Sequence, residues 1–301
     1  MLDDDLSRVV SSGFGVRIDA ARPIVGAGDE CLLSHVTAPR PLVVRAAPAW
    51  RSDAELRWAY GIAAALNCYV PEVVAPDPPD ILRWRGRAVT IWPYVPGRHL
   101  DRDRPDDRAA AAQLLARLHR AALLIDDPGP RPPSADNSSN GRPEWPSSAP
   151  SRDLVDPELD DALASWPAGA GATAARGAIH GDFYRRNVLT SGDRLALLDW
   201  DDARMDALSV ELAWSVWEFG HVGPALDMPR ALAFLDDYRR TGGPPYDLGM
   251  IVPFIRERLR WEVTRSRAMA AVGEYHDLAY EATEVCAFGW LREVTLADRE
   301  R

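Results

Sequence analysis

"AIHGDFYRRNVLTSGDRLALLDWDDA", residues 178–203, concentrates a histidine, several carboxylates and an asparagine around two short apolar runs. The runs VLT and LALLDW flank the turn SGD, a pattern typical of a β-hairpin. Asn187 precedes the first strand and Asp199 ends the second, so the hairpin is expected to bring them together. Their amide and carboxylate oxygens are hard ligands of the kind that Mg²⁺ prefers. Asp182, on the loop before the hairpin, can accept a hydroxyl proton.

The composition argues against several other classes of protein. A net charge of −10 disfavours a nucleic-acid partner, because such a partner requires a basic surface. Cys31, Cys68 and Cys286 form no CxxC pair, which argues against a zinc knuckle or a disulfide framework and favours a cytoplasmic location. The acidic start lacks the pattern of a signal peptide, and no apolar run is long enough to span a membrane. All 35 basic residues are arginine, since the chain contains no lysine.

The distribution of apolar residues predicts an α+β protein in two parts. Residues 1–94 are expected to form a small, mostly antiparallel sheet with one helix over 51–67, where Ser52 and Glu55 make a capping-box pattern. Residues 95–301 are expected to be mainly helical, with a mobile, proline-rich insertion at 126–150. The expected strands cover 24–36, 41–47, 70–76 and 81–95, the last of which folds back on itself at Arg85–Gly86. The later helices are expected over 106–125, 209–220, 254–272 and 279–294.

The stretch HGDFYRRN followed by LLDWDDA resembles the aminoglycoside phosphotransferase and choline kinase-like family of small-molecule kinases. AAQLLARLHRA and IWPYVPGR resemble the family's helix before the catalytic loop and its interlobe segment. The resemblance implies a bilobal protein-kinase-like fold, with a nucleotide-binding lobe over 1–94 and a catalytic, substrate-binding lobe over 95–301. It also implies that Asp182 is the catalytic base and that Asn187 and Asp199 bind Mg²⁺. His180 is expected to be a buried, hydrogen-bonded support below the loop.

The resemblance implies a site for ATP or GTP in the first lobe. The family places a basic residue on a central strand, and the candidate here is Arg45 in place of the lysine of most kinases. Glu55 is the candidate partner that orients Arg45, although the capping box explains Glu55 equally well. Backbone groups near four further residues are expected to contact the nucleotide: Gly26, Gly28, Trp92 and Tyr94.

The second lobe is expected to bind a small-molecule hydroxyl acceptor. Family members that act on aminoglycosides have acidic pockets, so Asp202 and Glu218 are candidates to contact a cationic acceptor. A solvated acidic turn explains Asp202 equally well, and Trp214 and Trp217 are expected in the core. The favoured function is a magnesium-dependent kinase, monomeric or homodimeric, that phosphorylates a hydroxyl of a small molecule such as an aminoglycoside antibiotic. Neither a nucleic-acid nor a membrane partner is expected.

Three alternatives are weighed against this function. The acceptor is alternatively a small metabolite, such as an amino alcohol or homoserine. The absence of lysine motivates a second alternative, a nucleotide-binding pseudokinase or ligand-sequestering protein. A third, an acidic metallohydrolase, requires a cluster of metal ligands that the sequence does not contain.

Overall fold

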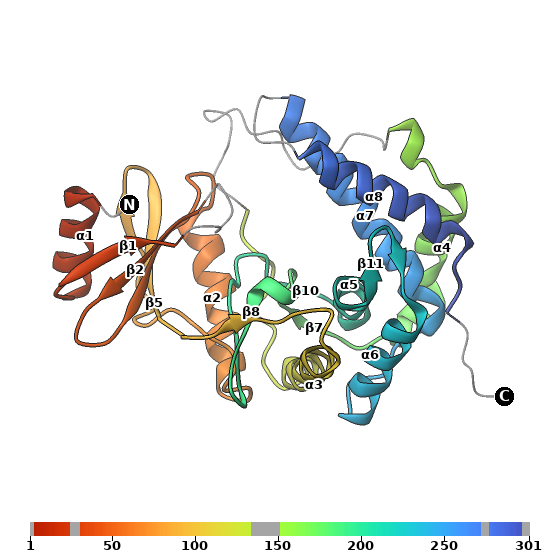
Figure 1. Ribbon diagram of the computed structural model, residues 1–301, viewed down its shortest axis with the longest axis horizontal. Coiled ribbons are helices and arrows are strands. Elements are labelled where there is room, and N and C mark those ends of the chain that lie inside the picture. Colours follow the sequence, from red (N-terminus) through yellow and green to blue (C-terminus); the bar gives the residue numbers. More distant parts are fainter. Residues whose placement is uncertain (1–2, 25–30, 134–150, 272–276, 297–301) are drawn as a thin grey trace. The chain divides into compact units, whose positions relative to one another are not determined.

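A computed structural model describes residues 3–24, 31–133, 151–271 and 277–296 (Figure 1). The chain divides into two compact units, each made of several segments. The first unit contains Met1–His99, Ile125–Asp136 and Asn187–Arg204, and the second contains Leu100–Leu124, Asn137–Arg186 and Met205–Arg301. The sequence predicts a nucleotide-binding lobe that ends at residue 94 and a catalytic lobe that begins at residue 95. This division of roles stays a prediction.

The first unit contains a five-stranded antiparallel sheet with the strand order β1-β2-β3-β5-β4. The mostly antiparallel sheet predicted for this part of the chain is thus present. Arg85 and Gly86, with φ angles of 48° and 77°, form the turn between the last two strands, as predicted. The strand expected at 70–76 is wrong, because Val73 makes only an isolated bridge to Leu197. The strands are β1 (Ala20–Pro23), β2 (Leu32–Thr37), β3 (Leu42–Ala46), β4 (Leu82–Trp84) and β5 (Arg87–Pro93).

Two helices pack in this unit, where the sequence predicted one. Helix α2 (Asp53–Asn67) follows Ser52, whose hydroxyl accepts the N–H of Glu55 at 3.0 Å. Helix α1 (Asp4–Phe14) was not predicted, although Asp3 caps its first turn in the usual way. Its residues Leu6 and Val10, one helical turn apart, are buried in the apolar core of the sheet.

The predicted hairpin is present in the first unit. Strands β8 (Val188–Ser191) and β9 (Arg194–Leu197) pair antiparallel, and β6 (Arg98–His99) pairs with β8. The N–H of Leu198 donates to the carbonyl of Asn187 at 2.8 Å, so Asn187 and Asp199 lie at the same end of the hairpin. The second strand ends earlier than predicted, because Asp199 has a φ of 62° that turns the chain out of the sheet.

The second unit is mainly helical, as predicted. Helix α5 is buried along almost its whole length and contacts α3, α6 and α7 (Figure 1). Its α-helices are α3 (Pro105–Ala122), α4 (Pro157–Ser165), α5 (Leu208–Gly220), α6 (Met228–Arg240), α7 (Leu248–Ala271) and α8 (Leu278–Trp290). Its short strands pair as β7 (Arg176–Ile179) with β10 (Arg204–Ala207), and β11 (His221–Val222) with β12 (Ala225–Leu226). Short 3-10 helices cover Arg152–Leu154, Trp166–Ala168, Ala170–Thr173, Arg185–Asn187 and Leu291–Glu293.

No helix in the described part of the chain is both long and apolar enough to cross a membrane.

The start of the predicted mobile insertion packs on the first unit. The indole N–H of Trp58 donates to the carbonyl of Gly129 at 3.1 Å, and the hydroxyl of Ser52 donates to the carbonyl of Pro133 at 2.9 Å. Residues 126–133 therefore make specific contacts with the first unit, and the mobility expected for 126–150 stays a prediction. Although proline lacks an N–H group, its carbonyl still accepts hydrogen bonds from side chains. Residues 134–150 lie outside the described residues.

Candidate functional site

The loop that carries Asp182 follows strand β7 and is fixed through its backbone. The ring Nδ1 of His180 accepts the N–H of Asp182 at 3.2 Å, and His180 is completely buried. The prediction of a buried, hydrogen-bonded histidine is therefore confirmed. Gly181 has a φ of 83°, a conformation that favours glycine, and its N–H donates to the Glu211 carboxylate at 2.6 Å. The carboxylate of Asp182 remains partly exposed, at 32%.

Glu211 connects this loop to two other helices of the second unit. Its second oxygen lies 3.0 Å from Nε2 of His119, whose Nδ1 lies 2.8 Å from the hydroxyl of Tyr238. Burial acts to raise the pKa of Glu211, but the bonds from His119 and the Gly181 N–H lower it overall. Neither Glu211 nor His119 belongs to the motif residues to which a role was assigned from the sequence. The sequence signal for such residues is an acidic side chain or a histidine within an otherwise apolar helix, because a polar side chain that is buried needs a hydrogen-bond partner.

The Glu211→Gln variant is expected to lose about 1–3 kcal/mol of unfolding free energy, because the amide cannot accept both hydrogen bonds with two charged oxygens. Turnover should fall as well, since Gly181 anchors the loop that carries Asp182. Urea unfolding and steady-state rates measure the two effects. Glu158→Gln, at an exposed position of α4, is the matched control and should change neither. Equal stability of the two variants would show that Glu211 does not anchor the loop.

A cationic side chain lies beside Asp182. Nη2 of Arg258 is 3.9 Å from a carboxylate oxygen of Asp182 and 2.7 Å from Glu262. The guanidinium group also lies over the rings of Trp214 and Trp261, at 5.1 and 4.5 Å from their centres. The aromatic faces and the two carboxylates together restrain Arg258. Nothing in the sequence indicates that this arginine of α7 reaches the loop.

Glu218, predicted to contact the acceptor, is buried in α5 beside Arg102, at 3.5 Å. Burial raises the pKa of its carboxyl, against the effect of Arg102. Trp214 and Trp217 of the same helix are buried as expected, at 7% and 4% exposure.

A second buried carboxyl lies near Glu218. Glu284 of α8 is 4% exposed, and the hydroxyl of Tyr280 lies beside its carboxyl. Burial raises the pKa of Glu284 to about 8, and the charges of Glu262 and Glu218 add to the rise. The adjacent Tyr280 hydroxyl and Arg258 act against it. A buried carboxyl beside other carboxyls is costly to ionise, so this cluster is suited to a positively charged ligand.

In the first unit, Arg45 occupies the central strand β3 as predicted, but it is bound by carboxylates. It donates to both oxygens of Asp201, with one distance of 2.6 Å, and to Asp199 at 3.1 Å. Tyr60 accepts from Arg45 at 2.8 Å and donates to Asp201 at 3.0 Å. Although burial alone would lower the pKa of Arg45, the charge of Asp201 raises it well above its usual range.

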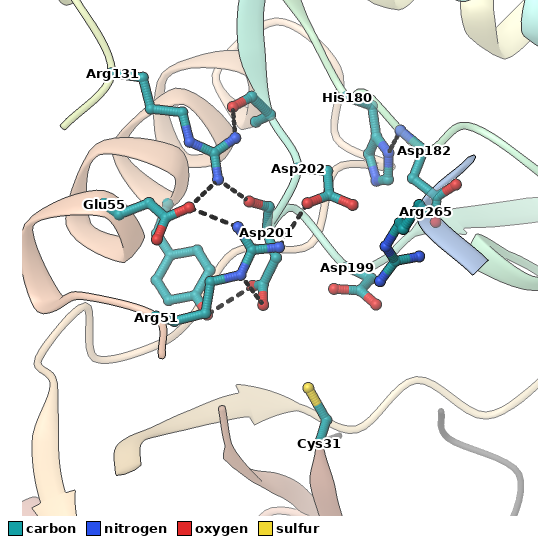
Figure 2. A network of polar contacts seen from close by, with 12 residues as sticks. Cys31, Arg51, Glu55, Arg131, His180, Asp182, Asp199, Asp201, Asp202 and Arg265 are labelled. Carbon is teal, nitrogen blue, oxygen red and sulfur yellow. Dashed lines mark hydrogen bonds and ion pairs between the residues drawn. The ribbon is translucent and has the colours of Figure 1, made fainter. Parts of the chain in front are cut away.

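Glu55 accepts hydrogen bonds from two other arginines, Arg51 at 2.6 Å and Arg131 at 2.5 Å (Figure 2). Its N–H is bound by Ser52, which confirms the capping contact. Its role in orienting Arg45 stays a prediction. Arg51 also donates a hydrogen bond to Asp202 at 2.5 Å. This ion pair within the first unit accounts for an acidic residue at position 202 without any contact to an acceptor. Contact of Asp202 with the acceptor likewise stays a prediction.

The remaining residues predicted to contact the nucleotide are only partly described. The indole N–H of Trp92 donates to Thr90 at 2.9 Å, and its ring meets the edge of Tyr60. The N–H of Tyr94 donates to the carbonyl of Pro41 at 3.2 Å. Nucleotide contacts at Trp92 and Tyr94 stay predictions. Gly26 and Gly28 lie outside the described residues.

The end of the hairpin offers oxygen ligands for a cation. The Asp199 side chain is 48% exposed, whereas Asn187 is buried at 6%. Across the described ranges, no group of three His, Cys, Asp or Glu side chains could hold a metal ion. A cation at Asp199 would therefore depend on an amide and on ligand oxygens. Mg²⁺ commonly binds with few carboxylates and with substrate phosphates, so these residues fit it.

Comparison with known sequences supports the motif. The sequence model of the phosphotransferase enzyme family matches residues 30–248. The homoserine kinase of Methylobacillus glycogenes is 30% identical over 162 residues, which cover 51% of this chain and 48% of that protein. The homoserine kinase of Methylobacillus flagellatus is 30% identical over 161 residues, with the same coverage. The match thus spans about half the length of these curated relatives.

Solved structures show the same fold at low sequence identity. An amicoumacin kinase in complex with AMP-PNP and Ca²⁺ has a TM-score of 0.67 at 13% identity, covering 95% of this chain and 93% of its own. A choline/ethanolamine kinase family protein from Mesorhizobium loti has a TM-score of 0.67 at 16% identity, covering 98% and 96%. These likenesses confirm the predicted α+β, protein-kinase-like fold. Because the family match covers well over half of its residues, the chain belongs to the phosphotransferase enzyme family, as the HGDFYRRN and LLDWDDA motifs predicted.

Proposed function

We propose that the protein transfers the γ-phosphoryl group of ATP to a hydroxyl group of a small molecule that carries a positive charge. The observation that carries the proposal is the position of Asp182 on a fixed loop, with its carboxylate partly exposed. Its loop is held by the bonds to His180 and Glu211, while its carboxylate remains partly exposed. A general base requires this combination of fixed position and access to the reacting hydroxyl.

The motif residues divide the chemistry among themselves in this proposal. Asp182 would orient the acceptor hydroxyl and accept its proton. Asn187 and Asp199 would hold Mg²⁺ through their oxygens. Bound Mg²⁺ would neutralise charge on the phosphates. Arg258, beside Asp182, would restrain the carboxylate while the hydroxyl approaches it.

The charge of the acceptor is inferred from the carboxyls of the second unit. The charges of Glu218 and Glu262 raise the pKa of Glu284, and the charge of Glu262 also raises that of Glu218. Arg102 and Arg258 offset only part of this negative charge. An ammonium group on the acceptor would offset more of it and make ionisation of Glu284 easier.

Two kinds of acceptor fit this requirement. Aminoglycoside-like antibiotics carry several amines, and the fold is shared with an amicoumacin kinase and a spectinomycin phosphotransferase. Homoserine, the second candidate, is favoured by the two homoserine kinases that are 30% identical over half of their length. Homoserine also carries an ammonium group, on the second carbon from the one that bears its hydroxyl.

A mass-shift screen tests the proposal. The protein is incubated with ATP and Mg²⁺, and each acceptor is examined for the added mass of one phosphoryl group. The panel pairs aminoglycosides, amino alcohols and homoserine with uncharged polyols and macrolides, with Mg²⁺ omitted in parallel. We expect transfer of the phosphoryl group to an amine-bearing alcohol only when Mg²⁺ is present. Nucleotide binding without transfer to any acceptor would favour a pseudokinase instead.

The Glu284→Gln variant is expected to change the pH dependence of stability. Because the pKa of Glu284 rises from 4.5 to about 8 in the folded protein, the folded state holds this proton more tightly than the unfolded chain does. The free energy of unfolding of the parent should therefore fall as pH rises from about 4.5 to about 8. The variant lacks this loss, so its advantage should grow over that interval to roughly 4 kcal/mol.

Urea unfolding at pH 5 and pH 8.5 measures this difference. Glu293→Gln, at an exposed position, is the matched control and should follow the parent at both pH values. Parallel stability curves for the parent and Glu284→Gln would show that Glu284 ionises like an exposed carboxyl. The KM for a cationic acceptor should rise about tenfold in Glu284→Gln, which is the size expected for one lost charged contact.

A further inference from the structure

Arg131 makes three hydrogen bonds to two separate elements of the first unit (Figure 2). Nη2 donates to the carboxylate of Glu55 in α2 at 2.5 Å and to the backbone carbonyl of Asp201 at 2.6 Å. Nη1 donates to the backbone carbonyl of Ala203 at 2.7 Å. The side chain is 22% exposed, so most of it is removed from water. One guanidinium group thus joins a helix to the turn that follows Asp199.

This turn has an unusual backbone that requires support. Asp199 has a φ of 62°, in the left-handed region that L-residues seldom adopt. Inside the turn, the N–H of Ala203 donates to the carbonyl of Trp200 at 3.1 Å. The side chain of Asp201 binds Arg45, and the backbone carbonyls of Asp201 and Ala203 bind Arg131. The position of the Asp199 carboxylate therefore depends on contacts made further along the turn.

The contacts of Glu55 indicate that Arg131 supports the turn and is not needed simply for the stability of the fold. Glu55 is 3% exposed and retains Arg51 as a partner, at 2.6 Å, when Arg131 is removed. No buried charge of α2 is left without a partner by that change. The two carbonyls of the turn do lose the donors that Arg131 supplies. Removing Arg131 is thus expected to loosen the turn more than it weakens the unit.

We propose that Arg131 is a positioning residue, which holds the turn at Asp199–Ala203 so that Asp199 is oriented to bind the metal–nucleotide complex. The proposal rests on the proposed function for the role of Asp199. It assigns a function to the proline-rich segment 125–133, since its tethers at Gly129 and Pro133 bring Arg131 to the turn. Arg131 acts through the turn and need not contact the nucleotide or the acceptor.

Hydrogen exchange and nucleotide binding test the proposal in the full-length protein. Exchange of the amides at residues 199–204 is measured by mass spectrometry without metal or nucleotide. In Arg131→Ala these amides should exchange at least about tenfold faster than in the parent. Calorimetry should show about tenfold weaker binding of AMP-PNP with Mg²⁺, the effect typical of residues that support a metal ligand. Binding of AMP-PNP without Mg²⁺ should be unchanged, and Arg131→Lys should recover part of both losses.

Arg40→Ala is the matched control, because it removes an arginine of the same unit whose exposed ion pair with Asp77 does not involve the turn. It should resemble the parent in both measurements. Parent-like exchange and binding in Arg131→Ala would overturn the proposal. If Arg131→Ala does not fold, Arg131→Gln decides by the same two measurements. If the parent itself binds no Mg–AMP-PNP, the proposed function fails, while the exchange experiment still tests whether Arg131 holds the turn.

Discussion

The Asp182→Ala variant is expected to turn over its acceptor about 10²–10⁴-fold more slowly than the parent, as for the loss of a general base. Its loop should remain in place, because the backbone bonds to His180 and Glu211 do not involve the substituted side chain. The KM for the nucleotide should therefore stay near the parent value. A loss confined to kcat would identify a group that acts during the chemical step rather than in nucleotide binding.

Steady-state kinetics with the acceptor found in the screen measure this effect. Asp193→Ala, which removes an exposed carboxylate at the turn between β8 and β9, is the matched control and should retain parent activity. Urea unfolding checks that both variants are folded. An Asp182→Ala variant that phosphorylates its acceptor at the parent rate would disprove the role of Asp182.

The Arg45→Ala variant is expected to lose about 3–5 kcal/mol of unfolding free energy, the usual result of breaking a buried ion pair. Asp201 is only 5% exposed and receives hydrogen bonds from Arg45 and Tyr60. Although burial acts to raise the pKa of Asp201, the charge of Arg45 and its hydrogen bonds keep that pKa below its usual value. Without Arg45 the carboxylate must be buried with weaker compensation. The double variant with Asp201→Asn should recover much of the loss.

Arg40→Ala is the matched control, because Arg40 forms an exposed ion pair with Asp77 at 2.9 Å in the same unit. Such a pair contributes no more than about 1 kcal/mol. Urea unfolding of the variants decides between two roles for Arg45. If Arg45→Ala is as stable as Arg40→Ala but no longer binds nucleotide, Arg45 is a phosphate ligand, as the family resemblance implies, and the ion pair with Asp201 is of minor importance.

Features that depend on neighbouring residues could be predicted from the sequence. The hairpin follows from two apolar runs around SGD, the start of α2 from Ser52, and the turn between β4 and β5 from Gly86. The buried state of His180 followed from the family resemblance and is confirmed. In each case the relevant contacts lie within a few residues, or belong to a motif of known geometry.

Features that depend on pairing between distant segments could not be predicted. Arg131 and Glu55 are far apart in the chain, and a proline-rich context gives no sign that an arginine will be buried there. Arg258 is one of many arginines, and only the packing of α7 brings it to Asp182. Helix α1 has an ordinary cap and two apolar positions, which become informative only when the core beneath them is known. With every basic residue an arginine, residue type alone could not identify the important ones.

The most direct test is a crystal structure with Mg²⁺, AMP-PNP and the unphosphorylated acceptor. We expect a cation about 2.0–2.1 Å from an oxygen of Asn187 and one of Asp199, the distance usual for Mg²⁺. We also expect the Asp182 carboxylate to accept a hydrogen bond from the acceptor hydroxyl. A cation bound by other residues, or an Asp182 carboxylate turned away from the hydroxyl, would contradict the proposed function.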